Sequence, residues 1–431
     1  MRYAPIDPGL FVQNRRRLTE ALAPNSIAVV NANDAMPTNA DGCFPMRVSS
    51  DLFYLTGVEQ EQTILVLFPD ARDEKQREIL FLREPNAEAE TWEGHKLTKE
   101  EARAQTGIRS IEWIQDFPKL FHRLMCECDH VYLNLNEHKR AVIEVTTRDA
   151  RFVADCKARY PLHTYHRLAR VLHRLRAVKS ETEIGILKKA CAITEAGFRR
   201  VLPFVRPGVT ETEVEAEFAH EFIRRGGQFA FGPIIARGAN ACVLHYGDNS
   251  DTCRKGDLLL LDVAASHANY NSDMTRTIPV GGRFSARQRK VYNAVLRVMR
   301  ASANNLVPGK LIKTWQGEAE QLMEKELVDL GLLSLREIKR QKAEHPAVKK
   351  YFMHGLGHPI GLDVHDVGIV TEPMQAGWVM TCEPGLYIPS EKMGVRLENM
   401  IHITPEGPVD LMGSIPIEAG EIEDLMHANN A

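Results

Sequence analysis

Two matched pairs of acidic side chains are the residues of this sequence best suited to do chemistry. Asp262 and Asp273 lie eleven residues apart, and Glu383 and Glu398 lie fifteen residues apart. If each pair sits on a hairpin its two acids face each other, and directly opposed like charges destabilise a pair of strands. A buried cluster of carboxylates also takes up protons or repels itself. Two such pairs in one chain therefore predict a bound cation between them.

The facing arrangement depends on where each hairpin turns. A symmetric first hairpin must turn at His267-Ala268, and a symmetric second hairpin must turn at Ser390-Glu391. A turn elsewhere would change which residues lie opposite each other. We therefore expect the strands of both hairpins to pair about these two centres.

Three histidines lie between the acidic pairs, in the glycine-rich segment His354–Asp366. His354 and His358 have the i, i+4 spacing of a zinc-protease helix. The glycines and the proline around them are poor helix formers, and the glutamate that such helices place after the first histidine is absent. We therefore expect a glycine-rich turn that runs into a strand, not a zinc-binding helix.

Whether His358 and His365 serve one site depends on the backbone between them. Seven residues separate them, so on a regular strand they would face opposite sides. A bend at Gly361 would bring both side chains to the same side.

One imidazole and four carboxylates make a hard ligand set, which favours manganese or magnesium-like ions and also admits cobalt or zinc. Four carboxylates exceed what one catalytic ion needs, and two ions bridged by Asp273 and Glu398 would use them all. Two such ions, about 3.5–4 Å apart, lower the pKa of a bridging water and polarise a carbonyl group. The sequence thus predicts two divalent ions, with manganese preferred, and hydrolysis by a bridging hydroxide without a protein nucleophile.

The elements that carry these residues fall into two parts. Residues 25–172 alternate between strand and helix patterns, which predicts an α/β domain with a mixed sheet. Its expected elements are strands at 26–31, 63–68, 78–82 and 130–135 and helices at 99–106 and 116–126. A capping box at Ser180–Glu183 then opens a strong helix. We place the boundary near residue 175, which gives domains 1–174 and 175–431.

The second domain contains a weak internal duplication. Two pairs of helices are expected, at about 181–202 and from about 210, and at about 286–306 and 314–330. After each pair an apolar run ends in an acid: Asp262 lies six residues after Gly256, and Glu383 lies six residues after Gly377. The first helix of each pair is followed by Pro-Gly, which is common stop chemistry. The shared offset nevertheless favours a pseudo-symmetric domain with its site between the two halves.

Composition limits the partners and the location. The 431 residues are 44% hydrophobic and 26% charged, with a net charge of −3, as in ordinary globular proteins. This balance gives no sign of a nucleic-acid or membrane partner. No secretory signal is visible, and no run of about 18 apolar residues occurs. The eight cysteines are scattered, and we expect reduced thiols in a cytoplasmic protein.

The acids and histidines lie in short segments that are specific as a set. The segments are Leu244–Tyr246, Tyr270–Thr277, His354–Asp366, Glu383–Tyr387 and Val395–Glu398. In order and spacing they resemble the pita-bread (creatinase/aminopeptidase-like) metallopeptidases, and in particular the aminopeptidase P family. Ser50–Gly57 and Glu90–Gly94 resemble the amino-terminal domain of that family, which methionine aminopeptidases lack. The resemblance implies an N-terminal mixed α/β domain followed by a pseudo-symmetric pita-bread catalytic domain.

The resemblance also implies a ligand set. The metal ligands of the family fall on Asp262, Asp273, His358, Glu383 and Glu398. Glu383 is further expected to move the proton of the attacking hydroxide.

Other site residues follow from the same match. His245 and His365 are expected to bind the substrate and its tetrahedral intermediate, and His354 matches a further site histidine. Arg396 matches an arginine paired with the metal-binding aspartate, so we group it with the catalytic residues. Tyr387 matches an outer-shell tyrosine beside the substrate.

The implied activity is hydrolysis of the bond between an N-terminal residue and a following proline, by a homodimer or homotetramer. Trp92 would reach the specificity pocket of a neighbouring subunit, or is an ordinary packing tryptophan. A prolidase, which cleaves only Xaa-Pro dipeptides, has the same fold and ligands and remains the alternative. A metal-free binding scaffold is a third possibility, but such relatives usually lose ligands, and all five are present here.

Overall fold

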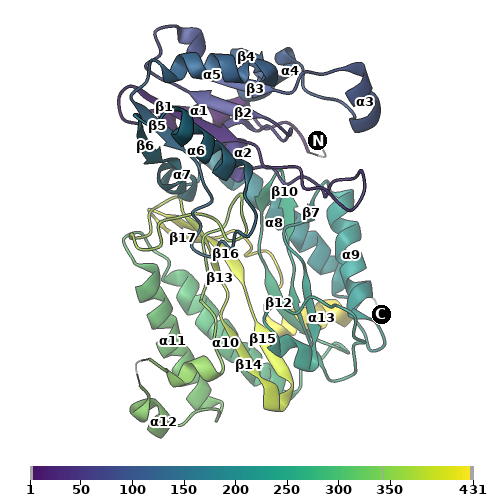
Figure 1. Ribbon diagram of the computed structural model, residues 1–431. Coiled ribbons are helices and arrows are strands. Elements are labelled where there is room, and N and C mark those ends of the chain that lie inside the picture. The colour runs from purple at the N-terminus through teal and green to yellow at the C-terminus, as the bar shows by residue number, and fades with distance from the viewer. Residues whose placement is uncertain (1–2, 343, 428–431) are drawn as a thin grey trace. The chain divides into compact units, whose positions relative to one another are not determined.

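The computed structural model describes residues 3–342 and 344–427. The chain forms two compact units, Tyr3–Arg176 and the residues from Ala177 onward. Figure 1 labels their helices and strands in chain order. No helix in the described ranges is both long and apolar enough to cross a membrane.

A six-stranded sheet forms the centre of the first unit (Figure 1). In spatial order its strands are β4 (Ser110–Trp113), β3 (Glu78–Leu82), β2 (Ile64–Leu67), β1 (Ser26–Asn31), β5 (His130–Leu133) and β6 (Thr164–Arg167). The central strand β1 pairs antiparallel with β2 and parallel with β5. The predicted mixed sheet is therefore confirmed.

The two edge strands are the ones that the sequence prediction lacks. β4 reads SIEW and β6 reads TYHR, and neither is fully buried. The inner strands β1 and β2 are buried at every position, which favours runs made mostly of apolar residues such as Val, Ile and Leu. An edge strand is short and carries polar side chains, so its pattern resembles that of a loop.

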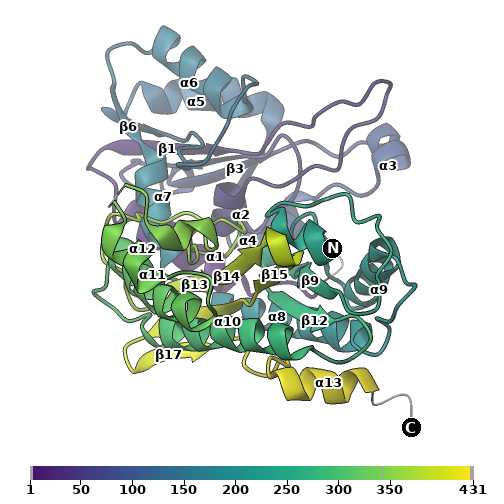
Figure 2. The same ribbon diagram turned by 90° about the horizontal axis from the view of Figure 1, so that it is seen from below.

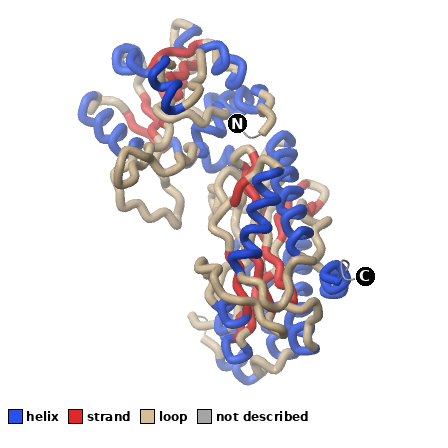
Figure 3. The backbone as a smooth tube through the Cα atoms, turned by 90° about the vertical axis from the view of Figure 1, so that its right-hand side faces the viewer, coloured by secondary structure: helices blue, strands red, loops and turns tan. Residues whose placement is uncertain are grey.

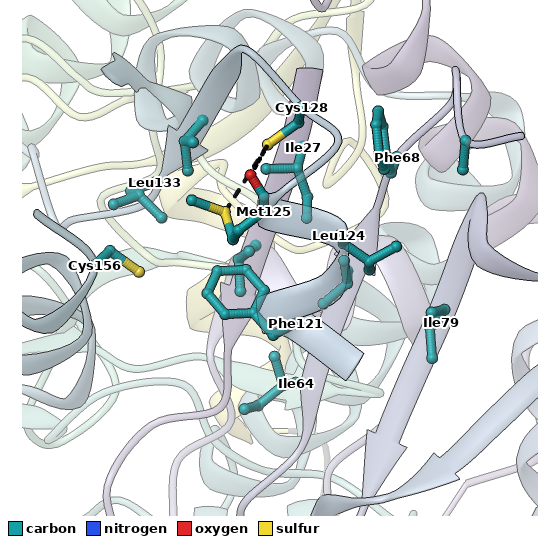
Figure 4. Close-up of a cluster of buried hydrophobic side chains, with 14 of the residues drawn as sticks. Ile27, Ile64, Phe68, Ile79, Phe121, Leu124, Met125, Cys128, Leu133 and Cys156 are labelled. Carbon is teal, nitrogen blue, oxygen red and sulfur yellow. Dashed lines mark hydrogen bonds between the residues drawn. The ribbon is translucent and has the colours of Figure 1, made fainter. Parts of the chain in front are cut away.

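Helices cover this sheet and complete its core. α5 (Phe117–Met125) and α6 (Arg148–Arg159) pack on one face, where Phe121 and Leu124 join Ile27 in a buried cluster (Figure 4). Each such side chain contributes about 1.5–3 kcal/mol when it is fully buried. The remaining helices are α1 (Pro8–Thr19), α2 (Ser50–Thr56), α3 (Ala87–Glu93), α4 (Lys99–Thr106) and α7 (Leu168–Ala177).

Two helix pairs border the strands of the second unit, as the duplication predicts. α8 packs on α9, and α10 packs on α11. The predicted capping box at Ser180 opens α8, and a second capping box, with Thr210 as the capping residue, opens α9. The helices are α8 (Glu181–Val201), α9 (Glu211–Arg224), α10 (Ala286–Asn304), α11 (Ile312–Asp329), α12 (Leu335–Arg340) and α13 (Ala419–His427).

The strands of this unit form small antiparallel sheets, and the helices pack on these sheets. α8 contacts β10 and β11, whereas α10 contacts β13, β14, β15 and β17. Figure 2 shows α10 lying across its strands, and Figure 3 shows strands bordered by helices. The first half contains β7 (Gln228–Phe229), β8 (Ile234–Arg237), β9 (Leu258–Asp262), β10 (Ala265–His267), β11 (Tyr270–Asn271) and β12 (Thr275–Pro279). The second half contains β13 (Val379–Cys382), β14 (Gly385–Ile388), β15 (Met393–Arg396), β16 (Asn399–Thr404) and β17 (Gly407–Asp410).

The first hairpin is paired differently from the prediction. Asp262 of β9 lies opposite Thr275 of β12, not opposite Asp273. The turn falls at Ala268-Asn269, whose φ angles are 50° and 65°. Positive φ at both central residues is what a tight two-residue turn between twisted strands requires, and Asn tolerates it. The turn that forms thus shifts the centre of the hairpin by one residue, and it shifts the residue opposite Asp262 by two.

The second hairpin confirms its predicted register. Gly385 pairs with Arg396, and Cys382 pairs with Asn399 on the neighbouring ladder. Glu383 and Glu398 lie between these two ladders, at positions that continue both pairings. The two glutamates are therefore opposed, as expected.

The histidine segment is bent but does not enter a strand. An isolated bridge, Pro359 to Met380, pairs it with β13, and the Ile360 N–H donates to Val379 O at 3.1 Å, but this pairing does not extend into a strand. The expected strand after the glycine-rich turn is thus wrong. The N–H of Gly361 donates to Asp363 O (3.1 Å), and that of Asp366 donates to Pro359 O (2.9 Å). These local bonds replace the pairing that a strand would need.

Candidate metal and catalytic site

Three of the five predicted ligands converge closely. One ligand atom each from Asp273, His358 and Glu398 lies within 4.8 Å of the other two. His358 Nε2 lies 3.5 Å from Asp273 Oδ2 and 3.7 Å from Glu383 Oε1. Asp262 belongs to the same charged group, because the Asp273 carboxylate raises its pKa. The two acidic pairs and the histidine therefore form one cluster.

The backbone fixes the orientation of His358. Its Nδ1 lies 2.9 Å from Pro359 O, so Nδ1 carries the proton and Nε2 presents a lone pair to the acids. The His358 N–H donates to Thr381 Oγ1 at 3.0 Å, and the Thr381 N–H donates to His358 O at 2.9 Å. The hydrogen bond from ring Nδ1 to Pro359 O is typical of metal-binding histidines, whose second ring nitrogen donates to a nearby oxygen.

Burial gives the acids unusual proton affinities. Burial, opposed by the Arg396 charge and reinforced by Asp273, raises the pKa of Asp262 to about 6. Burial raises the pKa of Glu383 to about 7, with a smaller opposing effect from His358. The pKa of Glu398 also lies well above its usual value, from burial and then from Asp273. Without a cation, the folded site holds carboxylates that compete for protons.

Two carboxylates are each held through one oxygen only. Arg396 Nη2 donates to Asp262 Oδ2 at 2.5 Å, and Thr275 Oγ1 donates to Glu398 Oε2 at 2.7 Å. The other oxygens, Asp262 Oδ1 and Glu398 Oε1, are buried and accept no hydrogen bond within the described ranges. A buried acceptor without a partner is costly. Hard divalent cations bind such oxygens, so this donor set fits the predicted metal.

A chain of hydrogen bonds leads away from Asp262. Arg396 Nη1 donates to the Tyr387 hydroxyl oxygen at 2.7 Å, and that hydroxyl lies 2.8 Å from His354 Nε2. His354 Nδ1 lies 2.7 Å from Gly355 O, so Nδ1 donates and Nε2 accepts from the tyrosine. Burial, followed by the Arg396 charge, lowers the pKa of His354 to about 4. His354 is therefore neutral near pH 7.

The remaining histidines lie at the edge of the cluster. The rings of His358 and His365 stack, with centroids 4.0 Å apart and planes 10° apart, which confirms that the backbone bends between them. His365 itself is exposed, and so is His245. His245 follows η3 (Gly238–Cys242). Its neighbours Leu244 and Tyr246 pack on the cluster that contains Tyr387.

Trp92 is the predicted site residue that belongs to the first unit. It lies on α3 of the first unit, with 83% of its surface exposed. A tryptophan so exposed does not pack inside its own unit. The packing interpretation is thus wrong for the single chain.

Two threonines complete the site and have no role in the sequence prediction. Thr275 holds Glu398, and Thr381 holds the backbone of His358. Each lies two residues from a predicted ligand, Asp273 or Glu383. Because side chains two apart in a strand share a face, this spacing could have identified both.

Comparison with known proteins agrees with this geometry. Residues 185–405 match metallopeptidase family M24, and residues 11–132 match the aminopeptidase P N-terminal domain. The Xaa-Pro aminopeptidase of Escherichia coli is 33% identical over 434 residues, covering 97% of both chains. That of Haemophilus influenzae is 33% identical over 430 residues, again covering 97% of both.

Solved structures extend the likeness to the whole fold. Zinc-substituted aminopeptidase P of Escherichia coli in complex with product has a TM-score of 0.86 at 33% identity and covers 99% of both chains. Aminopeptidase P of Pseudomonas aeruginosa has a TM-score of 0.89 at 31% identity, covering 99% of this chain and all of its own, 100%. The expected fold, a mixed α/β domain followed by a pita-bread domain, is confirmed. The chain belongs to metallopeptidase family M24 and, within it, to the aminopeptidase P group.

Proposed function

We propose that this protein removes the N-terminal residue from peptides whose second residue is proline, with divalent metal ions held by residues of domain 175–431. The observation that carries the proposal is the convergence of Asp273, His358 and Glu398. Glu383 and Asp262 lie beside them, and two buried carboxylate oxygens of this cluster have no hydrogen-bond partner among the described residues. The names of the whole-length relatives, Xaa-Pro aminopeptidases, support this substrate class.

Five residues would hold the metal: Asp262, Asp273, His358, Glu383 and Glu398. We propose two ions, with manganese preferred over cobalt or zinc, because four carboxylates exceed the need of one ion. When bound, the ions would polarise the scissile carbonyl and lower the pKa of a water molecule.

The protein groups supply binding and proton transfer. Glu383, a carboxylate whose Oε1 lies 3.7 Å from His358 Nε2, would accept the proton of the attacking water and pass it on. Neutral His354 holds Tyr387, and Arg396 holds Asp262, so these three position the site. His245 and His365 would bind the substrate and the oxyanion that develops on its carbonyl.

The decisive experiment compares substrates of different length. Metal-loaded protein is incubated with an Xaa-Pro-Yaa tripeptide and with the Xaa-Pro dipeptide. An aminopeptidase releases the first residue of the tripeptide, whereas a prolidase acts on the dipeptide only. Absence of tripeptide cleavage in the presence of Mn²⁺ would contradict the proposal, and cleavage of the dipeptide alone would establish the alternative.

Assembly and location complete the proposal. We propose a cytoplasmic homodimer or homotetramer in which the exposed Trp92 contacts the substrate pocket of a neighbouring subunit. Trp92→Ala should then raise KM for tripeptides while light scattering shows the same oligomer. An unchanged KM would remove Trp92 from the substrate site.

A further inference from the structure

A buried ion pair outside the predicted site lies beside one of its histidines. Lys179 Nζ lies 2.9 Å from Asp366 Oδ2, and each side chain is only 1% exposed. Removing two charges from water is costly, so such a pair is rarely the most stable way to fill a core. What the ion pair does provide is a fixed orientation of the Asp366 side chain. Asp366 is the residue directly after His365.

The backbone of the same loop links the fixed Asp366 to the position of the His365 ring. The Asp366 N–H donates to Pro359 O at 2.9 Å, which closes the loop between them. The closed loop brings His365 back over His358, with the ring centroids 4.0 Å apart. Both the backbone and the carboxylate of Asp366 are therefore fixed, one by Pro359 and the other by Lys179.

Lys179 is itself held in place. It directly precedes Ser180, the capping residue of α8, and its N–H donates to Gly377 O at 2.9 Å. The ammonium group thus projects from a fixed helix start, and the loop with His365 is attached to that helix.

Gly361 shows how closely this pair is packed. A Cβ atom at residue 361 would lie 2.3 Å from Asp366 Oδ2 and 2.9 Å from Lys179 Cε. Real Cβ atoms do not approach other atoms so closely. A methyl group at this position would therefore displace the ion pair without removing either charge.

We propose that Lys179 and Asp366 are positioning residues, which hold the His365 ring over the metal-ligand histidine for contact with the substrate. The proposal rests on the proposed function, because it gives His365 its role at the substrate. The ion pair acts through the loop that Asp366 closes, and neither charged group touches the substrate.

The test is a double-mutant cycle with Asp366→Asn and His365→Ala, assayed on an Xaa-Pro-Yaa tripeptide with the metal-loaded full chain. Asp366→Asn alone should lower kcat/KM by about tenfold or more, since small misplacements of a binding group cost this much. In the His365→Ala background the same change should cost less than about twofold, because the group that it positions is gone. Lys179→Met should behave in the same way.

An undiminished loss in the His365→Ala background, or no loss in the single variant, would overturn the proposal. Metal content measured on each variant should equal that of the parent, which separates loop positioning from damage to the ligand cluster. Val214→Ala, a buried change in α9, is the control: it should lower the melting temperature and leave kcat/KM within about twofold.

Gly361→Ala tests the same claim without altering a charge. It should lower kcat/KM by a similar factor and show the same coupling to His365→Ala. This variant therefore tests the proposal even if Asp366→Asn does not fold. If His365→Ala itself is fully active, the proposed role of His365 fails. If it is impaired but uncoupled from residues 361 and 366, only the positioning inference fails.

Discussion

At the scale of single residues, the two oxygens of Asp262 differ in their hydrogen bonding, and so do the two oxygens of Glu398. Arg396 and Thr275 each fix one oxygen, of Asp262 and Glu398 respectively. The second oxygen of each has no hydrogen-bond donor within the described ranges. Fixed outer partners orient ligands and raise metal affinity. The donors that hold the ligands should therefore matter nearly as much as the ligands themselves.

Asp273→Asn or Glu398→Gln should lower kcat/KM by at least about a hundredfold, since even outer partners cost 10–100-fold. Both ligands lie at the convergence of the cluster, and an amide supplies only one neutral oxygen. Circular dichroism should show a retained fold. Asp257→Asn, outside the cluster, serves as the control. Near-normal turnover in either ligand variant would contradict its assignment.

Thr275→Val should weaken metal binding by about 10–100-fold while the protein stays folded. The change removes the hydroxyl that donates to Glu398 Oε2 at 2.7 Å and leaves a side chain of similar shape. Titration of the metal-free protein with Mn²⁺ measures the effect. Thr404→Val, at the far end of β16, where the hydroxyl donates to Gly407 O, is the matched control. Equal affinities of the two variants would count against the role of Thr275.

At the scale of elements, tight turns decide which residues meet. The hairpin of β10 and β11 turns at Ala268-Asn269, both with positive φ. That turn sets the pairing of Asp262 with Thr275 on the longer strands. Asp262 and the threonine that holds Glu398 are thereby brought together. Turn conformation and ligand geometry are thus linked through the register.

Asn269→Val should lower the free energy of unfolding by about 1–2 kcal/mol, because a β-branched residue is strained in the left-handed region. Asn269 has a φ of 65°. Denaturant unfolding measures the loss. Asn269→Gly is the control, since glycine accepts this conformation without strain, and it should stay within about 0.5 kcal/mol of the parent. Similar losses in both variants would show that the side chain, and not the backbone, is decisive.

At the scale of the whole molecule, the catalytic unit builds one site from two similar halves. β9 and β12 of the first half supply or flank the aspartates, and β13 to β16 of the second half flank the glutamates. In addition to burial, the aspartate charges of the first half raise the pKa values of Glu383 and Glu398 in the second half. Metal binding and the stability of this unit should therefore be coupled.

Metal removal should make stability depend on pH. Burial raises the folded-state pKa of Asp262 to about 6 and of Glu383 to about 7, whereas unfolded acids titrate near about 4. The folded metal-free protein thus binds more protons in this window, so its free energy of unfolding falls as pH rises from about 4 to 7. Bound ions would replace these protons and diminish the fall.

The measurement is the denaturant midpoint at pH 5 and pH 7.5, once with EDTA and once with Mn²⁺. The denaturant midpoint with Mn²⁺ should exceed the midpoint with EDTA by more at pH 7.5 than at pH 5, because stability falls with pH mainly in the metal-free protein. All other titrating groups are common to both series and cancel in this comparison. Parallel pH dependence with and without metal would contradict the coupling.

The sequence was sufficient for most elements and for the ligand types. Strands β1 and β3 and helix α4 lie at their predicted bounds, because buried strands and capped helices carry strong local patterns. The second hairpin also has its predicted register. The edge strands β4 and β6 escaped prediction, since partial exposure removes the apolar pattern.

Residue types and order along the chain already indicate the chemistry, because four acids and an imidazole are the donors of a hard metal site. Folding settles three further features: which oxygen of Asp262 and of Glu398 accepts no hydrogen bond among the described residues, which threonines hold the ligands, and how Lys179 reaches Asp366 across 187 positions of the chain. The physical reason is the separation along the chain over which each property is decided. Residue type and periodicity are local properties, whereas hydrogen-bond partners and burial depend on segments that meet only after folding.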